Sequence, residues 1–193
     1  MRLTVLASLL LLAAAPAAFA QDQDAVHGDA ALTYHWVRSN TSAGECGCFN
    51  LDGGGLSGSW EFHPRIAAVT EISAENATRV LATKKSLTLT SYLAGARYWL
   101  PQPWPSGAHS PEPFAQVLLG AVHPGGGIAG TGDGAYSFAT RIGGGLDLSL
   151  TSHFALRLIQ IDYYLTHSVN ASNDHQNNLL VGAGIVFRWS RGK

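Results

Sequence analysis

Apolar and polar residues alternate with a period of two along most of the chain, the pattern of β-strands that bury one face. In the stretch 176–189, for example, Leu179, Val181 and Ile185 share an apolar face and Arg188 lies on the other. Eight such segments are separated by glycine, proline and polar residues: 29–38, 53–62, 66–73, 87–100, 114–123, 137–150, 154–165 and 176–189. The pattern predicts eight β-strands.

The alternation breaks inside segment 154–165. Leu156 and Leu158 oppose Arg157, but farther along Ile159 and Ile161 belong to the apolar set. One extra residue near Leu158 and Ile159 restores a single apolar face, because a β-bulge flips the alternation. We therefore predict a bulge at this point.

The lengths of strands and connections favour a barrel that crosses a membrane. The segments are close to the roughly 9 to 11 residues that a tilted transmembrane strand needs. The connections 39–52, 74–86, 124–136 and 166–175 are long, those after the second and sixth strands are short, and 101–113 is an exception. Outer-membrane barrels have long outer loops and short periplasmic turns, so their connections alternate in length in the same way. We expect an all-β fold, an eight-stranded antiparallel up-and-down transmembrane β-barrel with both mature ends in the periplasm.

Residues 1–20 have the pattern of a secretory signal peptide. Arg2 precedes an apolar run, and Ala18-Phe19-Ala20 forms a cleavage site before the polar Gln21. The apolar run is shorter than the roughly 20 residues of a membrane-spanning helix. We expect this segment to be removed and residues 21–193 to form one barrel domain.

Composition agrees with an exported all-β protein. Charged residues make up 13% of the chain, 22 of its 193 residues are glycine, and the formal net charge is −1. The chain has no basic patch or charge run, so we expect no nucleic-acid partner.

The chain also resembles a known class of barrels. Gly184, Phe187 and Trp189 match the closing strand of bacterial outer-membrane β-barrels, although four more residues follow Trp189. The stretches GGGLDL, FALRLIQIDY and QNN within 114–189 are similar to small porin-family or OmpA-like barrels, including versions common in soil acidobacteria. The resemblance implies the bacterial cell outer membrane as the location. It also implies two partners, outer-membrane lipid and the barrel-assembly machinery, which would read these three residues as an assembly signal.

If the apolar faces meet lipid, the opposite faces line the lumen and carry equal numbers of acids and bases. They are Glu61, Glu71, Asp147 and Asp162, with Arg97, Arg141, Arg157 and Arg188. An eight-stranded barrel is only wide enough for its own side chains, and buried charges need partners. We expect a network of paired charges that plugs the lumen, with a charge-selective channel or a catalytic cluster as alternatives.

Two cysteines, Cys46 and Cys48, lie in the first long connection. They do not complete a four-ligand zinc site, and we predict no metal and no cofactor. Export favours oxidation, yet a disulfide across one residue is geometrically tense. A strained local disulfide or an intermolecular role is our expectation.

Three functions remain open from the sequence. The first is a non-enzymatic outer-membrane barrel with a structural or surface-interaction role, binding an extracellular ligand through its long loops. The second is a narrow channel for small solutes. The third is an outer-leaflet lipid-modifying hydrolase: His167 and Ser168 have an order similar to the His-Ser pair of barrel lipid A deacylases, without their spacing. A soluble lipocalin-like binder is disfavoured, because its lumen would be apolar.

Overall fold

The structure is a computed structural model that describes residues 27–39, 49–80, 85–103, 109–127, 135–167 and 176–190. Residues 1–20, Cys46 and Cys48 lie outside these residues. In the described part of the chain, no helix is long and apolar enough to cross a membrane. The eight strands are β1 (His27–Ser39), β2 (Phe49–His63), β3 (Ile66–Val80), β4 (Lys85–Trp99), β5 (Pro111–Gly125), β6 (Ser137–Ser149), β7 (Phe154–Thr166) and β8 (Gln176–Ser190).

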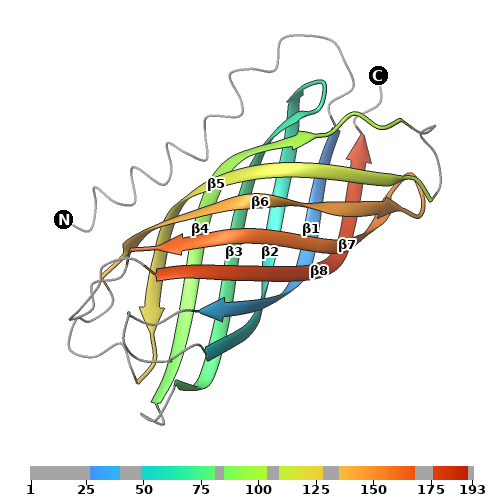
Figure 1. The fold of residues 1–193 in the computed structure, drawn as a ribbon. Coiled ribbons are helices and arrows are strands. Elements are labelled where there is room, and N and C mark those ends of the chain that lie inside the picture. Colours follow the sequence, from blue (N-terminus) through green and yellow to red (C-terminus); the bar gives the residue numbers. More distant parts are fainter. Residues whose placement is uncertain are drawn as a thin grey trace.

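Each strand pairs with the next in antiparallel order, and β1 pairs with β8, so the sheet closes into a barrel (Figure 1). The predicted up-and-down fold is confirmed. We call the end at which β1 begins and β8 ends the turn end, because the connections 64–65, 100–110 and 150–153 lie there. The opposite end, with the connections 40–48, 81–84, 126–136 and 167–175, is the loop end.

One predicted connection is wrong. The expected long loop 74–86 is mostly strand: β3 continues to Val80 and β4 begins at Lys85. Its inward side chains still alternate with outward ones, but the outward residues Asn76 and Thr78 are polar. Because both faces of this part of β3 carry polar residues, apolar and polar residues do not alternate there, and the pattern does not indicate a strand. The rhythm of long and short connections is therefore weaker than expected, since 81–84 is short and 100–110 is long.

The predicted bulge is confirmed. Asp147 pairs with Arg157 and the preceding Leu146 pairs with Ile159, which leaves Leu158 without a partner on β6. As a result Leu158 and Ile159 both point outward, while Arg157 is buried. The extra residue keeps one apolar face along the whole of β7.

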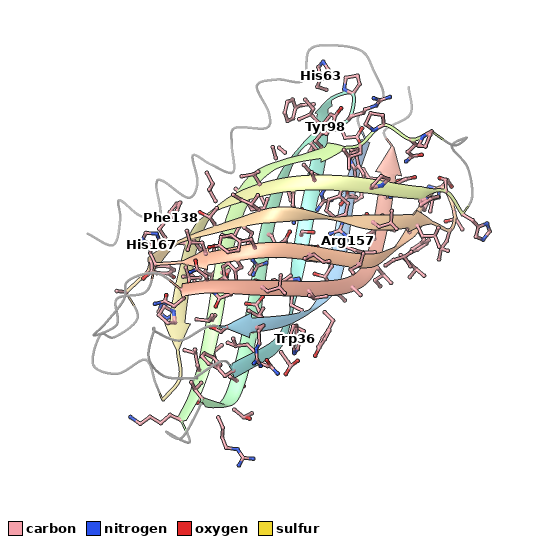
Figure 2. The ribbon with its side chains drawn as sticks, in the orientation of Figure 1. Trp36, His63, Tyr98, Phe138, Arg157 and His167 are labelled. Atoms are coloured by element: carbon pink, nitrogen blue, oxygen red, sulfur yellow. The ribbon has the colours of Figure 1, made fainter. Side chains whose placement is uncertain are left out.

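The outward face of the barrel is apolar. Its exposed large residues in the middle of the strands are Leu32, Leu56, Ile72, Val117, Leu119, Ile142, Ile161 and Ile185, which we call the apolar band. Exposed aromatic residues flank the band: Trp60, Phe62, Tyr98, Phe154 and Phe187 toward the turn end, and Tyr34, Tyr92, Tyr136, Phe138 and Tyr163 toward the loop end. Figure 2 shows Tyr98 near His63 at one end and Phe138 near His167 at the other.

Candidate functional site: the barrel lumen

The inward faces of the eight strands bring ionisable side chains of both signs together in the lumen. Three arginines are buried in the lumen, Arg97 and Arg141 at 0% exposure and Arg157 at 1%. They come from β4, β6 and β7, at positions where every second residue points inward. A guanidinium stays protonated in a protein, so each needs an acid or another acceptor beside it.

A first group of charges lies near the turn end, and we call it the turn-end cluster. Arg157 donates from Nε to Asp147 Oδ1 at 2.9 Å and from Nη2 to Asp147 Oδ2 at 3.1 Å. Arg188 lies 2.6 Å from Glu112 and 3.8 Å from Asp147, joining β8 to β5 and β6. The remaining pair is Arg97 with Asp29, at 3.4 Å between β4 and β1.

The ring of Phe114 lies between two of these arginines. The guanidinium carbons of Arg97 and Arg157 are 4.7 and 4.6 Å from its centroid. A cation over an aromatic face is attracted by the ring quadrupole. The attraction of both guanidinium groups to one ring therefore favours two like charges in the narrow lumen. The Phe114 ring also makes a T-shaped contact with the ring of Trp99, with 5.4 Å between the centroids.

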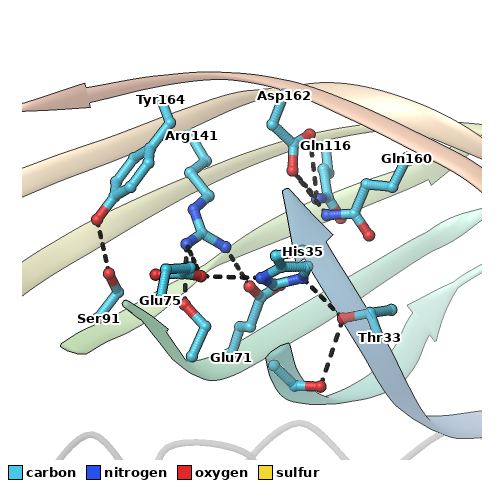
Figure 3. A network of polar contacts seen from close by, with 12 residues as sticks. Thr33, His35, Glu71, Glu75, Ser91, Gln116, Arg141, Gln160, Asp162 and Tyr164 are labelled. Atoms are coloured by element: carbon cyan, nitrogen blue, oxygen red, sulfur yellow. Dashed lines mark hydrogen bonds and ion pairs between the residues drawn. The ribbon is translucent and has the colours of Figure 1, made fainter. Parts of the chain in front are cut away.

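A second group, the middle cluster, is centred on Arg141 (Figure 3). Arg141 pairs with Glu71 and donates to Glu75 at 3.1 Å and to Ser73 at 2.8 Å, all on β3. Its guanidinium also lies 4.4 Å from the ring centroid of Tyr164, on β7. These contacts join opposite walls of the barrel through one side chain.

His35 completes the middle cluster. Its Nδ1 is 2.9 Å from Glu75 Oε1 and its Nε2 is 2.7 Å from Thr33 Oγ1. The imidazole fits because the neighbouring strands carry glycine there: a Cβ on Gly55 would lie 2.7 Å from His35 Cε1, and one on Gly182 would lie 3.1 Å from His35 Cδ2. Glycine on both sides is thus a packing requirement of the ring.

Hydrogen bonds link Thr33, His35 and Glu75 in a row. The order of hydroxyl, imidazole and carboxylate is that of a catalytic triad. Their exposures are 4%, 0% and 0%, and the Thr33 hydroxyl also donates to the carbonyl of Gly55 at 3.3 Å. A nucleophile must reach its substrate and be free to lose its proton. This row is therefore a structural hydrogen-bond chain.

Amide side chains connect the two clusters. Gln116 accepts from Arg97 Nη2 at 3.3 Å and donates to Asp162 at 3.2 Å. Gln160 donates to the same carboxylate at 2.6 Å and accepts from Arg157 at 3.1 Å. Among the described residues Asp162 has no ion pair. Hydrogen bonds from these two amides stabilise its buried carboxylate instead.

The loop-end half of the lumen differs from the expected polar interior. It holds a packed group that we call the apolar layer: Val37, Leu51, Val69, Ala77, Val80, Leu89, Leu93, Leu118, Val122, Ala139, Tyr164 and Leu180. Most of these residues lie beyond the predicted charges along their strands. The sequence predicts the paired charges but not this layer. Charges occupy the turn end and the middle of the lumen, and the loop end holds aliphatic side chains together with the buried polar residues Ser39, Ser91, Thr166 and Asn178.

Glu61 lies at the mouth of the lumen, beside the turn-end cluster. It lines a recess of about 400 Å³ at the turn end, together with Asp29, Trp99, Glu112 and Arg188. The structure therefore brings Glu71, Arg97, Arg141, Asp147, Arg157 and Asp162 into the lumen, and it places Glu61 and Arg188 at the mouth.

The sequence pattern missed three acids of these clusters, Asp29, Glu75 and Glu112. Each lies at the end of a predicted segment or just outside it, because the predicted segments are shorter than the strands of the structure. Continuing the inward series of β3 from Glu71 by two steps reaches Glu75. The alternation within 29–38 predicts that His35 points inward, but no pattern in the sequence marks it as a partner of Glu75.

The three residues of the expected assembly signal lie near the turn end of β8. Phe187 points outward and packs edge-on against Phe154 at 5.4 Å between centroids, and Trp189 covers Gly28 of β1. Gly184 has no room for a side chain, since a Cβ would lie 2.2 Å from the carbonyl oxygen of Leu32. Both Gly184 and Trp189 therefore serve the closure of β8 on β1.

Within the described ranges, no group of three or more His, Cys, Asp or Glu side chains is arranged to hold a metal ion. No protein-family model matches the chain, and no curated protein matches it either.

Several solved structures share its fold. Neisserial surface protein A aligns with a TM-score of 0.61 and 13% identity, over 86% of this chain and 100% of that one. The fold is that of the small outer-membrane β-barrels. OprG, an outer membrane protein of Pseudomonas aeruginosa, aligns at 0.55 with 8% identity over 87% and 98%. Ail, the attachment invasion locus protein of Yersinia pestis, aligns at 0.53 with 14% identity over 86% and 100%.

An outer-membrane barrel of eight strands has an interior just wide enough for side chains to fill. In this barrel the filling is of two kinds, ion pairs near the turn end and aliphatic side chains near the loop end. The chemistry of the lumen is accordingly that of a packed core.

Proposed function

We propose that this chain is an integral protein of the bacterial outer membrane. Its barrel is a closed anchor, and its role is structural or lies in surface interactions at the loop end. The observation that carries the proposal is the inverted distribution of side chains: an apolar outer face flanked by aromatic residues, with the buried charges inside.

The outer face supports residence in a bilayer. The apolar band has members on every strand except β4, and exposed aromatic residues lie on both sides of it. Contiguous apolar surface of this extent is unfavourable in water. In a bilayer it is the lipid-facing surface of a barrel, with the aromatic residues at the two interfaces.

The packing of the lumen supports a closed barrel. Arg141 links β3 to β6 across the interior, and Phe114 lies between Arg97 and Arg157. Beyond them the apolar layer fills the loop-end half. A steady water column would have to displace both the paired charges and the aliphatic core.

The similar solved proteins support a role at the surface. One is named a surface protein and another the attachment invasion locus protein. By analogy, the loop-end connections would carry the contact with an extracellular ligand. The assembly machinery would recognise β8 through Gly184, Phe187 and Trp189.

The first experiment tests the membrane barrel. We expect the protein in the outer-membrane fraction of cells, with faster migration on gels when it is left unboiled. A soluble protein, or one whose migration does not change on boiling, would contradict the proposal.

The second experiment tests closure. Purified protein in a planar bilayer should give no steady conductance. Steady conductance whose ion selectivity changes in the Arg141→Ala variant would favour the narrow channel instead. Mass analysis of lipid A from cells with and without the protein tests the hydrolase alternative, for which we expect no difference.

The third experiment tests orientation. With the loop end outward, a maleimide too large to cross the outer membrane should label Cys46 or Cys48 on intact, reduced cells. Labelling only after lysis would place the loop end in the periplasm.

A further inference from the structure

The recess of about 400 Å³ at the turn end lies beside the seam where β8 closes on β1. Four ionisable side chains line it, the carboxylates of Asp29, Glu61 and Glu112 and the guanidinium of Arg188. Three acids against one base give its lining a negative balance. A cationic group is therefore the occupant that the recess favours.

The pairs already formed in the recess leave room for another cation. Arg188 lies 2.6 Å from Glu112 and 3.8 Å from Asp147, so acids already balance its charge. Asp29 is 3.4 Å from Arg97, longer than the roughly 2.7 to 2.9 Å of a strong charge-assisted hydrogen bond. An ionised carboxylate has about four acceptor sites. A further cation would add to the contacts that these acids make and would not have to replace them.

Two cations directly follow the last strand. Beyond β8 the sequence continues as Arg191-Gly192-Lys193, residues that lie outside the described ones and that we call the basic tail. The preceding residues Arg188 and Trp189 both line the recess. The basic tail therefore starts at the rim of the recess, and its charge is opposite to that of the lining.

Glu61 lies at the same height as the start of the basic tail. Trp60 and Trp189 both pair with Gly28, from the two sides of β1, so β2 and β8 run in the same direction there. Glu61 and Ser190 are each the next residue toward the turn end. Two strand spacings, or about 10 Å, separate their backbones. Three residues of extended chain span about the same distance.

We propose that the basic tail folds back into the recess and that its cations pair with Glu61 and Asp29. Gly192 allows the chain to reverse there, because glycine adopts positive φ without a steric cost. A recess that excludes part of the water strengthens an ion pair relative to the open surface. The docked tail closes the mouth of the lumen at the turn end, as the apolar layer fills the lumen at the loop end.

The test is the rate at which trypsin cuts after Arg191, followed by mass on folded protein in detergent. A docked arginine is withheld from the protease, so we expect slower cutting than in a free peptide of residues 187–193. Glu61→Gln should speed the cut by about fivefold, which corresponds to about 1 kcal/mol. The matched control is Asp52→Asn, which removes an exposed acid at the loop end and should leave the rate at the wild-type value.

Three results would overturn the proposal. They are wild-type protein cut as fast as the peptide, an unchanged rate in Glu61→Gln, and an equal increase in Asp52→Asn. Unboiled gel migration checks that each variant is folded. Because the protein is in detergent, the result does not depend on the membrane orientation proposed above.

If Glu61→Gln does not fold, a disulfide takes its place as the test. In a background with Cys46→Ser and Cys48→Ser, Lys193→Cys should form a disulfide with Gln102→Cys, because Gln102 lines the recess. Lys193→Cys combined with Arg65→Cys is the control, since Arg65 is exposed at the turn end and does not line the recess. Equal disulfide yields in the two pairs would contradict docking of the tail.

Discussion

Arg157 donates two parallel hydrogen bonds to Asp147, from Nε at 2.9 Å and from Nη2 at 3.1 Å. The two residues are paired neighbours on β7 and β6, and Arg157 directly precedes the bulge at Leu158. Paired, charge-assisted hydrogen bonds of this geometry are among the strongest in proteins. The ion pair therefore holds the strand register at the point where an extra residue could let it slip.

Asp147→Asn should destabilise the barrel by about 3 to 5 kcal/mol, because it leaves Arg157 buried beside a neutral group. The measurement is the free energy of unfolding in urea, from lipid vesicles. Combining Asp147→Asn with Arg157→Met should cost less than the two single changes added together. Strictly additive costs would show that the two residues are not coupled.

Gly55→Ala should lower the free energy of unfolding by about 1 to 3 kcal/mol through overpacking. Its Cβ would lie 2.7 Å from His35 Cε1, and hydrogen bonds on both ring nitrogens keep the imidazole in place. Gly58→Ala on the same strand is the control, since the atoms nearest to its Cβ would be 4.0 Å away. In a His35→Ala background the cost of Gly55→Ala should fall, and an unchanged cost would rule out the clash with the ring.

Ala183→Arg should cost roughly 2 to 4 kcal/mol, because it puts a charge on the lipid face near the middle of β8. Asn177→Arg on the same face but near the loop end should cost about 0 to 1 kcal/mol. The measurement is unfolding from lipid vesicles. Equal costs at the two positions would contradict the membrane depth assigned to β8.

Leu118→Ala should cost about 2 to 5 kcal/mol, since Leu118 is buried in the apolar layer and its truncation leaves a cavity. The next residue, Leu119, is 49% exposed on the outer face. Leu119→Ala should cost less, because lipid chains refill the space. The comparison uses the same urea titration, and a larger cost at Leu119 would mean that the lumen is not packed there.

The sequence predicted the fold because barrel strands have a strict period of two. The alternation within 29–38 predicts that Leu32 and Tyr34 share one face, opposite Thr33 and His35. In the structure the first two residues are exposed and the other two are buried. The break at Leu158 could be interpreted as a bulge because a single inserted residue is the simplest way to preserve the apolar face of β7.

The contacts of the lumen could not be predicted in the same way. Whether Arg97 of β4 meets Asp29 of β1, three strands away around the barrel, depends on the stagger between strands. An alternating pattern does not encode that stagger. The apolar layer was missed for a related reason. Where both faces of a strand are apolar, as at Val117 and Leu118, alternation carries no contrast between lumen and lipid.

The two-part filling of the lumen means that the two ends of the barrel depend on different interactions. Ion pairs between strands hold the turn end. Packing of aliphatic side chains holds the loop end, and urea weakens that packing. Hydrogen exchange in urea should therefore begin beside Val37 and Leu180 rather than beside Asp29 and Arg188.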